Sequence, residues 1–142
     1  MKLIDLNVLL YAVNEDTHHH QRVRAWWESQ LGEDEPIALA WVVVLGFLRL
    51  ATNPSLFDRP LTAEQAIDCV DRWLRHPNIR LVTETREHWS TLRELLAEAG
   101  TAGNLTTDAH LAALAITHGA TLATCDNDFA RFPALRRVDP RA

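Results

Sequence analysis

Short apolar runs alternate with longer amphipathic stretches along the chain, and three of the longer stretches end on a glycine: Gly32, Gly100 and Gly119. Glycine is favoured just past the last turn of a helix, so the longer stretches are typical of helices. The short runs are apolar throughout, which is typical of strands that are covered on both faces. The pattern therefore predicts βαβ units and an α/β fold, in which helices cover both faces of a parallel sheet.

The expected boundaries follow from apolar periodicity and from cap residues. We expect strands at Lys2–Ile4, continuing through Val8–Val13, and at Pro36–Ala40, Ile79–Val82, Thr121–Thr124 and Leu135–Val138. We expect helices at His18–Leu31, at Trp41–Thr52, from a Thr62 cap to Arg75, at Thr85–Ala99 and from Thr106 or Thr107 to His118, with a short helix within Asp126–Phe132. The expected inward-facing residues are Val23, Trp26, Trp27 and Leu31 in the first helix and Ala66, Ile67, Val70, Trp73 and Leu74 in the third. The helix Trp41–Thr52 is apolar nearly all round, so we expect it to be buried.

Length and composition favour one ordinary domain, residues 1–142, because 47% of the residues are hydrophobic and can form a full core. The net charge of −5 argues against nucleic-acid binding by a broadly basic surface. Cys69 and Cys125 are too few and too far apart for a disulfide framework, so we expect free thiols. Asp5 and Asn7 interrupt any signal-type apolar run, and no apolar run is long enough to span a bilayer. We therefore expect a cytoplasmic protein that does not associate with membranes.

Four aspartates fall where the strands of such a sheet would end. Asp5 ends the first strand, Asp126 and Asp128 follow the fourth, and Asp108 opens the helix before the fourth. If the first and fourth strands are neighbours, all four carboxylates meet at one edge of the sheet, where ligands bind in folds of this class. Carboxylates at close range repel one another, and a hard cation such as Mg²⁺ or Mn²⁺ relieves that repulsion. The sequence thus predicts a metal site.

Each aspartate also has a purely structural interpretation. Asp108 suits a helix N-terminus because of the helix dipole, and Asp126 and Asp128 suit a turn and an N-cap. Asp5 has the least structural reason to lie at the end of an apolar strand, although Asn7 could share a turn with it. The joint placement of all four at one edge favours the metal site.

Three other groups of residues are weaker candidates. The tract His18–His20 could bind a metal, but the solvated start of a helix is the favoured interpretation. The five tryptophans fall within helical patterns and are interpreted as core and interface residues. Arg49 is the one charge on an apolar helix, so we expect either a partner for it, such as a site carboxylate or a substrate phosphate, or a side chain that extends to solvent at the helix end.

Several motifs of the sequence resemble those of PIN domains. Ile4–Leu10 resembles the opening motif of that family, Gly103–Ala113 its third acidic motif and Ala120–Phe132 its fourth. The stretch Trp41–Pro54, with Phe-Leu-Arg and Thr-Asn-Pro, is similar to a subgroup of VapC toxins common in mycobacteria and other actinobacteria. The resemblance covers essentially the whole chain, and the order and spacing of the motifs make it specific.

The resemblance implies a three-layer α/β/α sandwich whose parallel sheet of four to five strands has the order 3-2-1-4-5. It implies a Mg²⁺-dependent endoribonuclease, in which Mn²⁺ can substitute, that cleaves structured cellular RNA such as tRNA or rRNA loops. It also implies a homodimer inhibited by a VapB antitoxin. The metal-binding and catalytic residues would be Asp5, Asp108, Asp126 and Asp128, with Asp5 and Asp108 holding the principal ion. The supporting residues would be Asn7, Asn104 and Thr124, with Arg49 contacting RNA or antitoxin.

The chain departs from the family pattern at one place. PIN domains usually carry a glutamate early in the helix after the second strand, where this chain has Gly46. An alternative is therefore a catalytically weak or silent PIN-like protein that only binds RNA or a partner. A second rival, a receiver-type phosphoryl-transfer domain, requires an aspartate after the third strand and a lysine near the last. Here Val82-Thr83-Glu84 follows the third strand and the only lysine is Lys2, which disfavours that rival.

Overall fold

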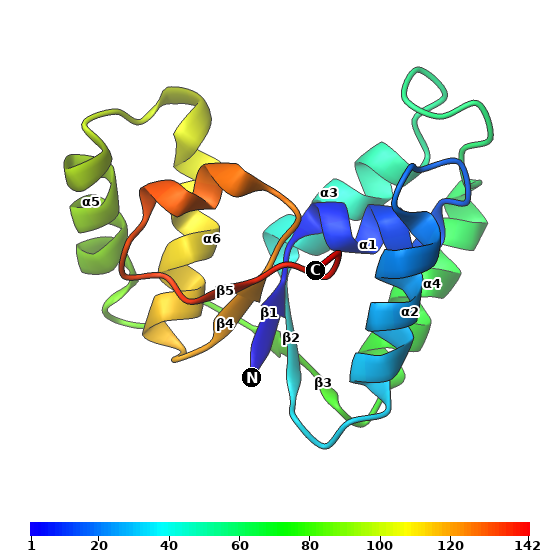
Figure 1. Cartoon of the computed structure of the whole chain (residues 1–142), viewed down its shortest axis with the longest axis horizontal. Coiled ribbons are helices and arrows are strands. Elements are labelled where there is room, and N and C mark those ends of the chain that lie inside the picture. Colours follow the sequence, from blue (N-terminus) through cyan, green and yellow to red (C-terminus); the bar gives the residue numbers. More distant parts are fainter.

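The computed structural model describes residues 1–142 as five strands, six α-helices and two 3₁₀ helices (Figure 1). In chain order these are β1 (Lys2–Ile4), α1 (Leu6–Val13), α2 (His20–Leu31), β2 (Ile37–Ala40), α3 (Trp41–Ala51), α4 (Ala63–Arg75), β3 (Ile79–Val82), α5 (His88–Ala99), η1 (Gly103–Leu105), α6 (Thr106–Thr117), β4 (Thr121–Ala123), η2 (Asn127–Arg131) and β5 (Arg137–Val138). The alternation predicted from the sequence is confirmed, with most boundaries within three residues.

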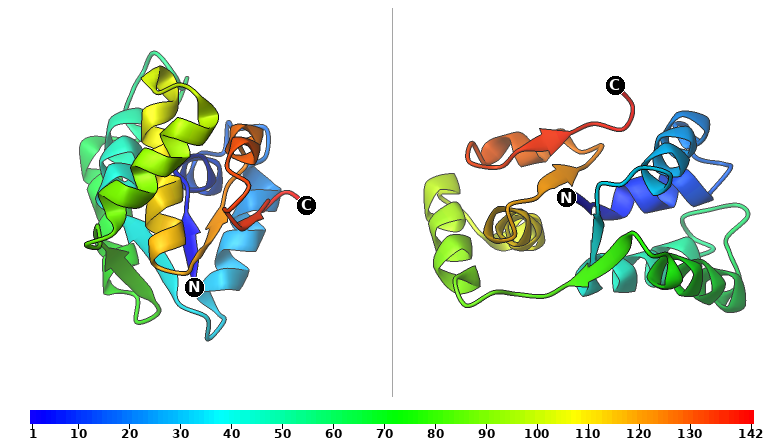
Figure 2. Two further views of the ribbon diagram at one scale, coloured as in Figure 1. Left: turned by 90° about the vertical axis from the view of Figure 1, so that its left-hand side faces the viewer. Right: turned by 90° about the horizontal axis from the view of Figure 1, so that it is seen from below.

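All strand pairs are parallel, and the sheet has the order β3-β2-β1-β4-β5. Figure 2 shows α5 and α6 on one face of this sheet and α1 to α4 on the other. The three-layer α/β/α architecture and the strand order implied by the resemblance are therefore confirmed. β1 lies at the centre, between β2 and β4, so residues that follow β1 and β4 share one edge of the sheet.

Cap residues explain where the helices begin and end. Thr62 and Gln65 form a capping box at the start of α4, in which each side chain accepts a hydrogen bond from the backbone N–H of the other. Gly100 and Gly119 follow α5 and α6 with φ of 71° and 65°, the left-handed conformation that favours glycine. Gly32 also ends its helix, but with a right-handed φ of −87°.

The expected continuation of the first strand through Val8–Val13 is wrong. The strand stops at Ile4, and the apolar run forms α1, because the Asp5 side chain accepts a hydrogen bond from the Leu6 N–H and caps the helix there. Short apolar runs cannot be assigned to strand or helix by periodicity alone. The helical turn sends the chain away from the sheet immediately after the strand.

Several residues expected in the core are exposed. Trp41 and Leu45 on α3 are 50% and 60% exposed, so this helix is not buried all round. On α4, Ile67 and Leu74 are also exposed, while Cys69 occupies the buried face between Ala66 and Trp73. When apolar residues lie on every face of a helix, as on α3, the sequence does not show which face is exposed. The structure thus leaves large apolar side chains exposed on both α3 and α4.

Both cysteines are buried and unpaired, as expected from their number and spacing. None of the helices combines the length and the apolar composition that a membrane span requires.

Candidate functional site

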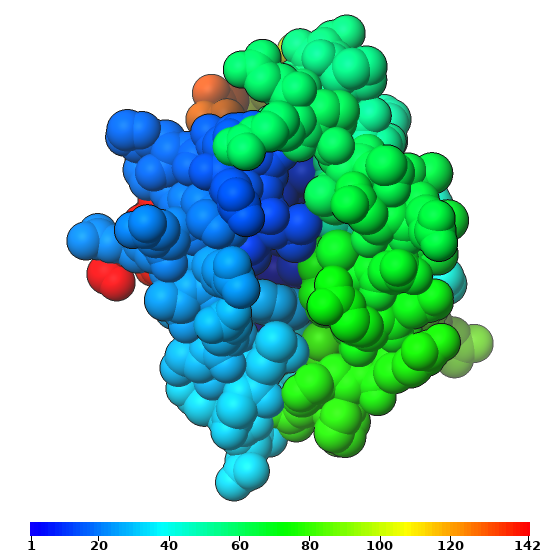
Figure 3. All heavy atoms as spheres, turned by 90° about the vertical axis from the view of Figure 1, so that its right-hand side faces the viewer, coloured from blue at the N-terminus to red at the C-terminus, as the bar shows by residue number.

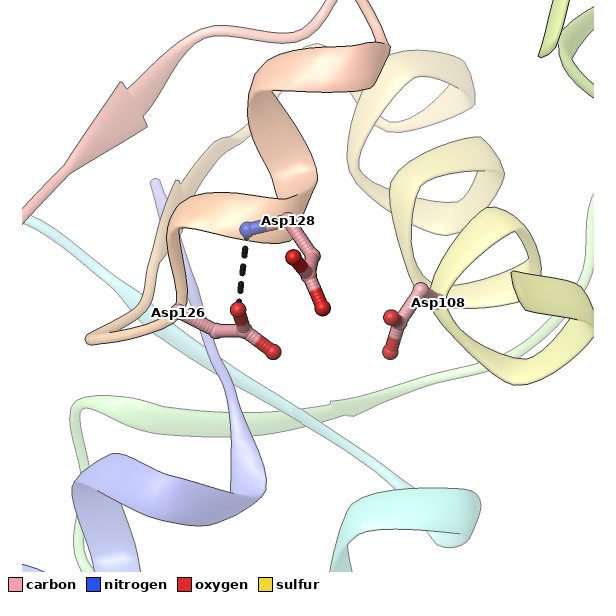
Figure 4. Close-up of side chains that lie close together, drawn as sticks. All are labelled: Asp108, Asp126 and Asp128. Carbon is pink, nitrogen blue, oxygen red and sulfur yellow. Dashed lines mark hydrogen bonds between the residues drawn. The ribbon is translucent and has the colours of Figure 1, made fainter. Parts of the chain in front are cut away.

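Three carboxylates converge at the carboxyl edge of the sheet (Figure 4). Asp126 follows β4, Asp128 lies in η2, and Asp108 lies in the first turn of α6. One oxygen from each carboxylate lies within 4.8 Å of an oxygen of the other two. Asp108 and Asp126 lie 18 positions apart in the sequence, yet their carboxylates lie close together in the folded protein.

Asp5 lies at the end of β1, beside this cluster, and is buried. Its Oδ1 atom accepts a 2.7 Å hydrogen bond from the Leu6 N–H, and its Oδ2 atom accepts a 2.6 Å hydrogen bond from the Thr124 hydroxyl. The Thr124 oxygen in turn accepts a hydrogen bond from the Asp126 N–H at 3.0 Å. Thr124 therefore connects Asp5 to the turn that carries Asp126.

Each aspartate also has a local structural role, which explains why the sequence folds this way here. Asp5 caps α1, Asp126 caps η2 by accepting from the Asp128 N–H at 2.8 Å, and Asp108 lies in the first turn of α6. The expectation that Asp5 has little structural reason for its position is wrong, because the chain turns into a helix directly after it. Each of these aspartates can therefore have a structural role and also bind a metal.

The electrostatics of the site are those of an uncompensated acidic cluster. The pKa of Asp108 is raised to about 6, first by burial and then by the charges of Asp5, Asp126 and Asp128. Burial also raises the pKa of Asp5, although hydrogen bonds from Thr124 and Leu6 oppose that effect. None of the protein's ion pairs involves these carboxylates. A set of carboxylate oxygens without a basic partner fits Mg²⁺ or Mn²⁺.

The predicted supporting residues have different environments. The Asn7 side-chain oxygen accepts a hydrogen bond from the Cys125 N–H at 3.1 Å, so Asn7 and Thr124 both hold the turn after β4. Asn104 is exposed in η1 and its side chain makes no hydrogen bond within the protein. Arg49 is also exposed, in the last turn of α3, and forms no ion pair. Of the two alternatives for Arg49, the structure therefore shows the side chain at the solvent-exposed helix end and not the pairing with a site carboxylate.

Gly46 is buried on α3 against the start of α1. A Cβ atom placed on it would lie 2.7 Å from the Cδ2 atom of Leu6, the residue that follows Asp5. Position 46 therefore lies against the residue that follows Asp5, and the Leu6 side chain fills the space next to it. A glycine in the middle of an apolar helix was the sequence signal for this close approach.

Several histidines make structural hydrogen bonds. His20 of the tract His18–His20 bonds through Nδ1 to the Tyr11 carbonyl at 2.8 Å, and His88 bonds to His110 at 2.9 Å between α5 and α6. The Cys125 thiol, which lies between Thr124 and Asp126 in the sequence, has its pKa raised to about 11 by burial and is not poised as a nucleophile. The carboxylate cluster is thus the one set of converging groups suited to metal-dependent chemistry.

One contact next to the site has no motif in the sequence that would predict it. The guanidinium of Arg141 donates a 2.7 Å hydrogen bond to the carbonyl of Cys125, from a segment that lies after the last strand. Only the folded structure brings residues 125 and 141 together.

Comparisons with known proteins agree with this architecture. The PIN domain family model matches residues 2–135. Ribonuclease VapC37 of Mycobacterium tuberculosis is 45% identical over 142 residues, which cover 100% of this chain and 99% of that protein. Ribonuclease VapC33 of the same species is 40% identical over 140 residues, covering 99% and 98%. The chain therefore belongs to the PIN-domain family, in its VapC branch.

The solved structures show the same fold. A crystal structure of VapBC2 from Rickettsia felis, bound to a DNA fragment from its promoter, matches with a TM-score of 0.69 and covers 97% of each chain at 22% identity.

Proposed function

We propose that this protein is a metal-dependent endoribonuclease, the toxin of a VapBC pair. The observation that carries the proposal is the convergence of the Asp108, Asp126 and Asp128 carboxylates, within 4.8 Å and without a basic partner, at the carboxyl edge of the sheet. Full-length relatives named ribonucleases support the same activity. A purely structural role, in which these aspartates only cap helices, does not explain why their carboxylates converge.

The residues of the chain have distinct parts in this proposal. Asp108, Asp126 and Asp128 would hold Mg²⁺ or Mn²⁺, and a cation held there lowers the pKa of a bound water and neutralises charge on a phosphate. The family resemblance implies Asp5 as a ligand of the principal ion, but Asp5 is not among the three residues whose carboxylate oxygens lie within 4.8 Å of one another. Its side chain accepts hydrogen bonds from the Leu6 N–H and the Thr124 hydroxyl, and it adds negative charge next to the cluster. The raised pKa of Asp108 keeps its carboxyl group partly protonated near pH 6 until a cation stabilises the charged form.

The substrate in this proposal is a structured cellular RNA, cleaved in a tRNA or rRNA loop. Single-stranded loops can reach a recessed edge because their bases are splayed and their backbone is flexible. The acidic net charge of −5 is compatible with this, since Asp5 and the three carboxylates of the cluster account for four negative charges and leave a remainder of −1. Arg49, which is exposed and free of ion pairs, is available to contact a phosphate or an antitoxin.

The test is RNA cleavage by purified variants in Mg²⁺ and in Mn²⁺. Asp108→Asn should reduce cleavage by more than about 100-fold, because it removes a metal ligand. Asp5→Asn should reduce it by about 10- to 100-fold, the effect of losing a residue that supports metal ligands. Asp34→Asn is the matched control, since Asp34 is exposed and lies outside the cluster. Full activity of Asp108→Asn in a folded protein would overturn the proposed site.

The alternative of a weak or silent nuclease rests on Gly46, the position of the missing glutamate. A wild-type protein that binds RNA but cleaves none of it at any Mn²⁺ concentration would establish this alternative.

The partners in this proposal are a VapB-type antitoxin and a second copy of the chain. An apolar hollow of about 380 Å³ lies between α2 and α4, lined by Val13, Trp27, Leu31, Cys69 and Trp73 among others (Figure 3). The hollow lies at the end of α1 remote from Asp5, so it does not border the carboxylates. Co-purification with the product of an adjacent reading frame, and sedimentation of the protein alone, test the two partners separately.

A further inference from the structure

Contacts of Arg141 hold the segment after β5 against the rest of the molecule. The Arg141 Nη2 atom donates to the carbonyl of Cys125 at 2.7 Å and to Oδ2 of Asp139 at 2.8 Å, and its Nε atom donates to Oδ1 of Asp139 at 3.0 Å. The Arg141 carbonyl accepts a 2.8 Å hydrogen bond from Arg22 on α2. This segment runs from the edge of the sheet toward α1 and α2 (Figure 1).

Cys125 lies between Thr124, which binds Asp5, and Asp126, which belongs to the carboxylate cluster. Its N–H donates to Asn7 at 3.1 Å, and its carbonyl accepts from Arg141. Both polar groups of this residue are therefore held, one from α1 and the other from the segment after β5.

We infer that Arg141 is a positioning residue for Asp126 and Asp128, acting through the Cys125 carbonyl. The inference rests on the proposed function, because it assigns Arg141 a part in the same site. With the carbonyl held, the backbone after Cys125 has one orientation, and the Asp126 carboxylate is presented toward Asp108. Without it, the turn is tied to the protein by fewer hydrogen bonds and the carboxylates spread over a wider range of positions.

The hydrogen bond from Arg141 to the Cys125 carbonyl is a strong one, because its donor is a charged guanidinium. The pKa of Asp139 is lowered by the hydrogen bonds from Arg141, so both groups are charged at neutral pH and the guanidinium is pre-oriented by two bonds to the carboxylate. Arginine suits this geometry because its rigid fork can bind a carboxylate and a carbonyl together. Arg141 also lies beyond residues 2–135, which the PIN family model covers, so the contact is additional to the motifs of the family.

The experiment compares Arg141→Gln with Arg136→Gln in the full chain. Arg136 is a matched control because its guanidinium also donates to a backbone carbonyl, that of Gly119, but before the start of β4. The first measurement is native-state hydrogen exchange at the amides of Cys125, Asp126 and Asp128. The second is the affinity for Mn²⁺, followed by titration of its magnetic resonance signal.

We expect exchange at the three amides to quicken about tenfold in Arg141→Gln, because a charge-assisted hydrogen bond that restrains the turn is lost. Mn²⁺ affinity should fall 10- to 100-fold, the usual effect of losing a residue that orients a metal ligand. Arg136→Gln should change neither quantity, and Asp139→Asn should act in the direction of Arg141→Gln with a smaller effect. Cleavage, where the wild type shows it, should be restored in Arg141→Gln by excess Mn²⁺.

Unchanged exchange at the three amides and unchanged Mn²⁺ affinity in Arg141→Gln would overturn the inference. So would equal effects in Arg136→Gln, because they would show a general loss of stability. The two proposals fail separately. A wild type without nuclease activity refutes the proposed function, whereas the exchange comparison still decides whether Arg141 restrains the turn.

Discussion

The Thr124 hydroxyl donates a 2.6 Å hydrogen bond to Oδ2 of Asp5, although the two residues are 119 positions apart in the sequence. The bond joins the carboxyl ends of β1 and β4, which are neighbours in the sheet. Because Thr124 also accepts from the Asp126 N–H, one hydroxyl fixes the relative positions of two aspartates. The geometry of the carboxylates therefore depends on an uncharged residue.

Thr124→Val removes this hydroxyl and keeps the shape of the side chain. We expect the free energy of unfolding to fall by about 2 kcal/mol, because the variant loses a hydrogen bond to a buried, charged acceptor. The pKa of Asp5 should rise further, since the lost bond lowers it at present. Urea denaturation at pH 7 measures the stability. Thr121→Val, on the strand that Thr124 follows, is the control, and equal losses in the two variants would show that the Asp5 contact contributes nothing specific.

The arrangement of the sheet edge was predictable, because aspartates after parallel strands can only meet where those strands end. The sequence predicts Asp5, Asp126 and Asp128 from the ends of the first and fourth strands and Asp108 from the start of the helix before the fourth. The structure places all four around one region. The contact between Arg141 and Cys125 was not predictable, since a backbone carbonyl has no sequence signature. The direction of the chain after Ile4 was also missed, because the apolar run Val8–Val13 satisfies both a strand and a short helix.

The pairing of Leu6 with Gly46 illustrates the same limit. The sequence shows a glycine in place of a glutamate, but only the fold shows that a leucine from the preceding motif packs against it. Likewise, the exposure of Trp41 and Leu45 depends on how α3 lies over the sheet, which an apolar stretch does not determine.

The raised pKa of Asp108 predicts how metal-free stability changes with pH. The pKa of Asp108 is about 6 in the folded protein and 3.8 for an ordinary aspartate, so between these pH values the carboxyl group ionises in the unfolded chain but stays protonated in the folded protein. The contribution of Asp108 to the free energy of unfolding should therefore fall as pH rises from about 4 to 6, and stay low above it. Asp108→Asn should be more stable than wild type at pH 7 by about 1 kcal/mol, a figure reduced for partial exposure.

The measurement is urea denaturation in a chelator at pH 5 and at pH 7.5, for wild type and Asp108→Asn. The difference between the two proteins isolates Asp108 from His88, whose lowered pKa contributes in the opposite direction over a similar range. Added Mn²⁺ should stabilise the wild type more than the variant. A difference between the proteins that does not depend on pH would contradict the assignment of the raised pKa.

Gly46→Glu tests whether the missing acidic position faces the site. The new side chain has to displace Leu6, so we expect a loss of about 1–3 kcal/mol in the free energy of unfolding. The double variant Leu6→Ala with Gly46→Glu provides space, and it should lower the Mn²⁺ concentration needed for half-maximal cleavage. Leu6→Ala alone is the control. An unchanged metal requirement in a folded double variant would show that position 46 does not reach the cluster.

The last prediction concerns inhibition by the antitoxin. The cluster has no basic partner within the chain, so an arginine or lysine from a bound antitoxin would satisfy the same charge as a divalent cation. Antitoxin affinity, measured by titration calorimetry, should therefore weaken as Mg²⁺ is raised at constant ionic strength. Asp126→Asn should weaken it about tenfold or more, the effect of losing a hydrogen-bonded charge pair, while Asp34→Asn should leave it unchanged. An affinity that ignores both Mg²⁺ and Asp126→Asn would place the inhibitory contact away from the carboxylates, with the apolar hollow between α2 and α4 as the next region to test by Trp73→Ala.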